Sequence, residues 1–206
     1  MLNLAQAFLQ GAVVGFAIAA PVGPIGVLCI RRTLANGRVA GLVSGLGAAT
    51  ADATYGGIAA FGVTFLLTLL ISQQVSIRLL GGLFLLLLGV RTFLSAPRDP
   101  HRNPEGSLAG DYLSTFALTL SNPVTMVAFA AIFAGLGITG QGGNYAAAAL
   151  LVSGVFTGSA SWWVILSSVV SALRGTFNSN RIQWVNRISG LVIGGFGVAT
   201  LLTILI

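Results

Sequence analysis

Six long apolar runs constrain this 206-residue chain more than any other feature of its sequence. Each run provides the roughly 20 residues that a helix needs to cross a hydrocarbon core of about 30 Å. Apolar and polar residues do not alternate with a period of two in these runs, as they do in the strands of membrane β-barrels. We therefore expect helices, because a helix forms its backbone hydrogen bonds within one segment. The runs cover residues 5–30, 40–70, 75–94, 112–137, 144–172 and 183–206. The sequence therefore predicts an all-α, polytopic membrane protein with six transmembrane helices.

The composition leaves little room for a soluble domain, because 55% of the residues are hydrophobic and 7% are charged. We expect a single transmembrane domain, residues 1–206. The hydrophilic segment 95–111 holds three of the four acidic residues and the only histidine, His101. This segment is predicted to be a loop that divides the chain into the halves 1–94 and 112–206.

The arginines predict the orientation of the chain in the membrane. Nine of the ten lie in the connections after the first, third and fifth runs, at positions 31, 32, 38, 91, 98, 102, 174, 181 and 187. Short cytoplasmic loops retain positive charge, so these connections, including the 95–111 loop, should be cytoplasmic and both termini external. Arg78 is the exception, and it either snorkels at the membrane boundary or pairs with Asp52 or a substrate carboxylate. The net positive charge of the chain is thus explained by the arginines of its cytoplasmic loops, and no nucleic-acid partner is expected.

The two halves of the chain also resemble each other. Segment 81–94 aligns with segment 189–202 through glycines and leucines at like positions. With three helices in each half, a duplicated unit must insert with the opposite orientation. Inverted repeats of this kind occur in many secondary transporters, whose substrate sites lie near the bilayer midplane at discontinuous helices. We therefore expect two inverted three-helix repeats, one in each half.

The stretch AAPVGPIG, residues 19–26, places Pro21 and Pro24 inside the first apolar run. Proline in a helix interior removes a backbone hydrogen bond and clashes with the preceding turn, at a cost of about 3 kcal/mol. The prolines lie roughly ten residues before Arg31, or about 15 Å along a helix, and therefore near the bilayer centre. We expect the first spanning helix to be broken at this depth.

The second half has its own candidate break in LSNPVT, residues 120–125. Backbone groups freed at membrane depth are tolerated where they are buried in protein or line a wet cavity, and a substrate carboxylate or ammonium can satisfy them. The plain alternative is that the prolines only kink their helices. The tryptophans at 162 and 163 either line the same cavity or pack against it. The candidate substrate-binding residues are Pro21, Gly23, Pro24, Asn122, Pro123, Thr125 and Trp162.

Asp52 is the only acidic residue within an apolar run. A carboxylate that faces lipid is costly, so Asp52 should face the bundle interior or water. Burial disfavours its charged form and a substrate ammonium favours it, so the acid can release a proton when substrate binds and regain it afterwards. We expect Asp52 to be the coupling residue. The alternative is a structural acid bonded to Thr50, Thr54 or Tyr55.

Several of these motifs occur together in one known family. They are PVGPIGVLCIRRTLANGRVAGLVSGLGAATAD from residue 21, LSNPVTMVAFAAIFAGLG from 120, GSASWWVILS from 158 and NRISGLVIGGFGVATLL from 186. Over nearly its whole length the chain resembles the lysine exporter (LysE/RhtB) family of bacterial amino-acid efflux proteins. The resemblance implies a secondary transporter of the bacterial inner membrane that exports amino acids or related small metabolites. A proton gradient or the membrane potential would drive it, with a proton expected as the coupling ion rather than sodium.

Other functional classes fit the sequence less well. An enzyme would need a nucleophile–base pair or a ligand cluster, but Cys29 is the only cysteine and the only histidine lies in the loop. Dithiol exchange needs two cysteines. A metal or other cation exporter with Asp52 as a ligand remains the alternative, although such a site requires several oxygen or sulfur donors. We expect no cofactor, and the oligomeric state, including a homodimer, stays open.

Overall fold

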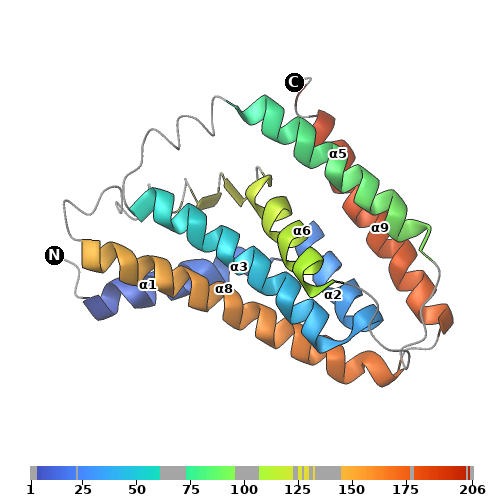
Figure 1. Cartoon of the computed structure of the whole chain (residues 1–206), viewed down its shortest axis with the longest axis horizontal. Helices are drawn as coiled ribbons and strands as arrows, with labels where there is room; N and C mark the ends of the chain where they lie inside the picture. The colour runs from blue at the N-terminus through green and yellow to red at the C-terminus, as the bar shows by residue number, and fades with distance from the viewer. Residues whose placement is uncertain are drawn as a thin grey trace.

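The computed structural model shows a set of packed helices (Figure 1). The structure describes residues 4–21, 23–60, 73–95, 107–122, 125–126, 128–129, 132, 145–176, 179–202 and 204. The helices in these ranges are α1 (Leu4–Ala19), α2 (Pro24–Asn36), α3 (Arg38–Ala60), α5 (Gln74–Phe93), α6 (Leu108–Leu120), α8 (Tyr145–Leu173), the 3-10 helix η1 (Arg174–Thr176) and α9 (Ser179–Leu202). All regular elements in this part of the chain are helical, which confirms the predicted all-α class.

Two described helical segments are long and apolar enough to cross a membrane unaided, Tyr145–Leu173 and Gln183–Leu202. The bent pair of α1 and α2 provides a third candidate span. The expected spans 40–70 and 112–137 extend into residues outside the described part. These apolar helices are those of a membrane protein, and the full count of six spans remains a prediction.

Helices from the two halves of the chain pack against each other. α1 lies along α8, α3 packs against both α8 and α6, and α5 lies along α9 (Figure 1). α2 contacts α3, α8 and α9, so it links the α5–α9 pair to the remaining helices. The chain therefore does not separate into two bundles made of one half each.

Glycines bring α1 and α8 into backbone contact. A Cβ added at Gly15 would overlap the carbonyl group of Val155, and one added at Gly158 would overlap the carbonyl group of Ala12. Small residues at four-residue spacing allow this close approach of membrane helices. These glycines therefore serve helix packing at this interface.

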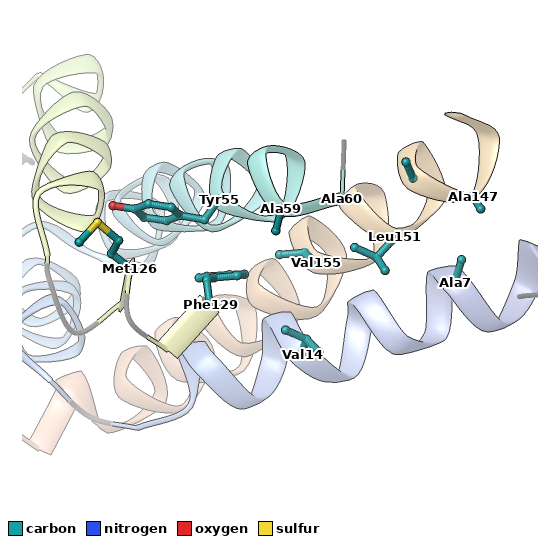
Figure 2. Packing of buried hydrophobic residues seen from close by; sticks show 11 residues of the cluster. Ala7, Val14, Tyr55, Ala59, Ala60, Met126, Phe129, Ala147, Leu151 and Val155 are labelled. Atoms are coloured by element: carbon teal, nitrogen blue, oxygen red, sulfur yellow. The ribbon is translucent and has the colours of Figure 1, made fainter. Parts of the chain in front are cut away.

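Two clusters of buried apolar side chains lie on either side of the first helix break. The first cluster joins α1, α3 and α8 and includes Leu151 and Val155 (Figure 2). In the same cluster the ring of Tyr55 stacks on that of Phe129, with centroids 5.7 Å apart. The second cluster surrounds α2 and includes Trp163. Together they hold the broken first span between longer, continuous helices.

α6 begins at Leu108, within the segment expected to be a loop. The side chain of Ser107 caps this helix by accepting a hydrogen bond from the amide of Gly110 at 3.3 Å. Asp111 lies in the first turn, where a negative charge interacts favourably with the helix dipole. Residues 96–106 of the expected loop, including His101, lie outside the described residues.

Candidate functional site

The first apolar run is divided into two helices. α1 ends at Ala19 and α2 begins at Pro24, and the helix axes differ by 79°. The amide of Val27 donates to the carbonyl of Gly23 at 3.0 Å, which starts the hydrogen bonding of α2. Gly23 provides no side-chain cap, and Pro24 occupies the first turn, where its missing N–H removes no helical hydrogen bond. The break predicted from Pro21 and Pro24 is confirmed.

A second interruption follows α6, which ends at Leu120. The amide of Asn122 donates to the carbonyl of Thr119 at 3.1 Å, and the carbonyl of Asn122 accepts from the amide of Met126 at 3.2 Å. Helical hydrogen bonding therefore restarts at Asn122, as it does at Gly23. The end of α6 agrees with the break predicted in residues 120–125, while Pro123 lies outside the described residues.

Residues of both breaks line one cavity of about 410 Å³. Of the candidate substrate-binding residues, Pro21, Gly23, Pro24, Asn122 and Thr125 belong to its wall. Other wall residues come from α1, α3, α5, α8 and α9, and most of them are apolar. A mostly apolar cavity of this volume with a few polar groups is typical of small-molecule sites.

Asp52 of α3 also lies at this cavity and is 3% exposed. Its Oδ2 atom accepts a hydrogen bond from the hydroxyl of Ser159 on α8 at 2.7 Å. The same hydroxyl oxygen accepts from Nε1 of Trp163 at 3.2 Å. Within the described part of the chain, no basic side chain lies within ion-pair distance of Asp52. The acid is therefore buried at the edge of a cavity, and its one partner among the described residues is neutral.

The three partners that the sequence suggested for this carboxylate bond elsewhere. Thr50 and Thr54 donate to backbone carbonyls of their own helix. The hydroxyl of Tyr55 donates to the carbonyl of Leu120 at 2.6 Å and so connects α3 with the end of α6. Ser159 was not identified from the sequence, because it lies 107 positions from the acid and no local spacing relates the two.

Of the two adjacent tryptophans, Trp163 lines the cavity and Trp162 does not. Trp163 is 4% exposed. Trp162 is half-buried and packs edge-on against Phe16, with ring centroids 5.6 Å apart. Neighbouring residues of a helix face different directions, so one of the pair had to point away from the wall. Arg78 is also absent from the described lining of the cavity.

A second polar cluster, which sequence reasoning missed, surrounds Arg32 of α2. The guanidinium Nε pairs with Oδ1 of Asp111 at 3.0 Å, and Nη1 also donates to the Asp111 carbonyl at 2.9 Å. Further hydrogen bonds reach the hydroxyls of Ser44, Thr115 and Ser114 at 3.0, 2.8 and 2.8 Å. This cluster joins α2 and α3 to α6, and so joins the two halves of the chain. In the sequence, Arg32 indicated only on which side of the membrane its connection lies.

The arrangement offers hydrogen bonds and one negative charge to a small organic solute. In the part of the chain that the structure describes, no group of three or more His, Cys, Asp or Glu side chains could hold a metal ion. The cavity instead combines the carboxylate of Asp52, hydroxyl groups and the start of α2. Free backbone amides at a helix start bind anionic groups.

Comparison with known proteins identifies relatives of this chain. A family model described as "LysE type translocator" matches residues 16–203. The protein named "Putative amino acid efflux protein YcgF" of Bacillus subtilis (strain 168) is 28% identical over 195 residues, covering 92% of each chain. The "Uncharacterized membrane protein YahN" of Escherichia coli (strain K12) is 30% identical over 177 residues, covering 82% of this chain and 77% of that protein. No solved structure matches the chain. Together, the broken helices, their motifs and these matches show that the chain belongs to the LysE type translocator family.

Proposed function

We propose that this protein is a secondary transporter, and not an enzyme, that exports amino acids or related small metabolites. The observation that carries this proposal is the cavity lined by both helix breaks and by Asp52. Secondary transporters bind their substrates near the bilayer midplane at discontinuous helices of this kind. Membership of a translocator family and the efflux name of the Bacillus subtilis relative support the substrate class and the direction of transport.

The proposed architecture has six transmembrane helices in two inverted repeats, residues 1–94 and 112–206, with a cytoplasmic loop at 95–111. The packing of the helices supports it. The first helix of each half, α1 or α6, contacts the second helix of the other half, α8 or α3. The third helices, α5 and α9, contact each other. The distribution of arginines supports an inner-membrane protein with both termini external.

Asp52 is the proposed coupling residue, and a proton is the proposed coupling ion. The acid is buried at the substrate cavity and is bonded to one neutral hydroxyl, that of Ser159. An intramembrane acid in such a place is a candidate for proton transfer. Binding of a substrate ammonium beside it would favour the charged form and release the proton. One titrating carboxylate suffices for this exchange, whereas a sodium site needs several oxygen ligands.

Transport by purified protein in proteoliposomes tests the proposal. The liposomes are loaded with a radiolabelled amino acid, and its efflux is measured with and without an imposed pH gradient or membrane potential. We expect at least one amino acid to leave faster than from protein-free liposomes, and a gradient to accelerate its efflux. Failure of a full amino-acid panel, together with efflux of divalent cations, would contradict the proposal and favour a cation exporter.

A further inference from the structure

The start of α2 presents backbone donors to the cavity without a cap. The amides of Ile25 and Gly26 lie in the first turn, where no earlier carbonyl of the same helix can accept from them. Gly23 at the N-cap has no side chain to satisfy them, although such caps usually carry Ser, Thr, Asp or Asn. All three residues line the cavity. The positive end of the helix dipole adds to the attraction for an anionic group.

Two buried side chains at the same cavity have hydrogen-bonding atoms to spare. Thr125 is 7% exposed and lines the cavity, and its hydroxyl makes no hydrogen bond with the described residues. Asp52 uses Oδ2 for its bond with Ser159, while Oδ1 has no donor among the residues that the structure describes. Both atoms belong to residues of the cavity wall, so a solute in the cavity can bond to them. The cavity thus has donors without an acceptor and a carboxylate oxygen without a donor.

The rest of the described wall restricts the charge of the solute. Asp52 is the only ionisable side chain in it, and residues such as Ile25, Leu85 and Phe196 make most of the remainder apolar. An additional charge on the solute would be desolvated there without a counter-charge, which costs several kcal/mol. A solute that fits must therefore carry one negative group, one positive group and an uncharged remainder.

We propose that the cavity binds the zwitterion of an amino acid with an apolar side chain. The α-carboxylate accepts hydrogen bonds from the amides of Ile25 and Gly26 and from the hydroxyl of Thr125. The α-ammonium donates to Oδ1 of Asp52, and the side chain packs against the apolar wall. This inference rests on the proposed function, because it names the substrate class and the binding mode of the same transport site.

Leucine and its analogues test the inference on the wild-type protein. Proteoliposomes are assayed for counterflow of radiolabelled L-leucine in competition with L-leucinamide, N-acetyl-L-leucine, L-lysine and L-glutamate. Unlabelled leucine should compete best. L-leucinamide and N-acetyl-L-leucine each lack one charged group, so we expect each to compete at least about tenfold more weakly, as expected for loss of a hydrogen bond to a charged group. L-lysine and L-glutamate each add a charge that the apolar wall would desolvate, so they should also compete at least about tenfold more weakly.

Gly23→Ala with Gly175→Ala as its matched control tests the carboxylate site. A Cβ at either glycine would meet nothing within 4 Å, and neither glycine has a positive φ, so both variants should fold. Gly23 belongs to the described wall of the cavity and Gly175 does not, so only the first methyl group takes up space where the solute carboxylate would bind. We expect Gly23→Ala to weaken leucine binding at least about tenfold and Gly175→Ala to leave it unchanged.

The outcomes separate this inference from the proposed function. Wild-type affinity for leucine in Gly23→Ala, or equal competition by leucinamide or N-acetylleucine, would overturn the binding mode. Lysine or glutamate transported as well as leucine would overturn the apolar class, while export of amino acids would stand. If no amino acid is transported at all, both the proposed function and this inference fail.

Discussion

At the residue scale, Arg32 and Asp52 are two ionisable side chains held in an apolar interior in different ways. Arg32 bonds to the carboxylate of Asp111, its backbone carbonyl and three hydroxyls, so its donors are well satisfied. Asp52 receives one hydroxyl donor and lies at a cavity. A buried charge whose hydrogen-bonding groups are all paired has a structural role. A buried acid with an oxygen that faces a cavity can bind a solute or a proton.

Arg32→Ala should strongly lower the thermal stability of the detergent-solubilised protein. Asp111 would lose its counter-ion in a site where the two side chains are 9% and 14% exposed. Removing one partner of a buried ion pair costs about 3–5 kcal/mol. Arg91 is exposed and lies outside this cluster, so Arg91→Ala is the control, with an effect of about 0.5 kcal/mol or less. Equal unfolding temperatures for the two variants would show that the ion pair contributes little to stability.

Asp52→Asn should separate proton coupling from packing. Asparagine keeps the size of the side chain and its ability to form hydrogen bonds but does not titrate. We expect the variant to fold, to lose gradient-driven export and to retain slow downhill exchange. Ser159→Ala removes the hydroxyl donor while leaving the carboxylate, so it should keep gradient-driven export. The measurement is efflux from proteoliposomes at several pH values, and normal export by Asp52→Asn with an unchanged pH dependence would make Asp52 a structural residue.

At the element scale, short helices bring the breaks to the cavity, and long helices support them and complete the wall. α2 and α6 have 13 residues each, about 20 Å at 1.5 Å per residue, which is less than the hydrocarbon core. α3 and α8 have 23 and 29 residues and pack against each other along the interface that holds Asp52 and Ser159. The broken helices are thus positioned by contacts with continuous ones and not by their own length.

Gly154→Ala should destabilise the α1–α8 pair. A Cβ at this position would overlap the backbone carbonyl of Phe8, so the two helices would have to move apart. Overpacking of this kind costs about 1–3 kcal/mol or more. Gly195→Ala on α9 is the matched control, because its Cβ would meet nothing within 4 Å. Unfolding temperatures in detergent measure both, and a Gly154→Ala variant as stable as Gly195→Ala would show that the close approach is not required.

At the scale of the whole molecule, helices from both halves enclose the cavity. Its wall includes Gly23 from the first half and Asn122 and Phe196 from the second. α1 with α8, α3 with α6 and α5 with α9 are pairs that each combine the two halves. Neither half alone could form this site, so the proposed transport activity needs both halves.

The proposed topology predicts opposite accessibility for two positions. A cysteine at Ser107, introduced in a Cys29→Ser background, should react with a membrane-impermeant maleimide only from the cytoplasmic side. Cys29 itself is buried, so its replacement removes a thiol with little reactivity. A tag placed after Ile206 should be accessible from outside intact spheroplasts. The reverse pattern at both positions would contradict the assigned orientation, and cytoplasmic exposure of both would contradict the inverted repeat.

Local features of the sequence were sufficient for the helical class and for the positions of the breaks. Apolar runs without a period of two predict helices because lipid offers no hydrogen-bond partners, so the backbone must form its hydrogen bonds within the segment. The prolines at 21 and 24 predict the first break because proline removes a helical hydrogen bond and clashes with the turn directly before it. The buried acid at position 52 could be assigned to the interior because a carboxylate facing lipid is too costly.

Contacts between distant helices were decided only by the tertiary structure. The partner of Asp52, the cluster around Arg32 and the choice of Trp163 over Trp162 at the cavity each depend on which helix faces meet. Those faces are selected by the fit of whole helix surfaces, through ridges, grooves and glycine contacts, and not by the spacing of a few neighbouring residues. The sequence by itself thus determined which elements form and where they break, whereas the packing of the two halves determined which polar atoms meet at the cavity.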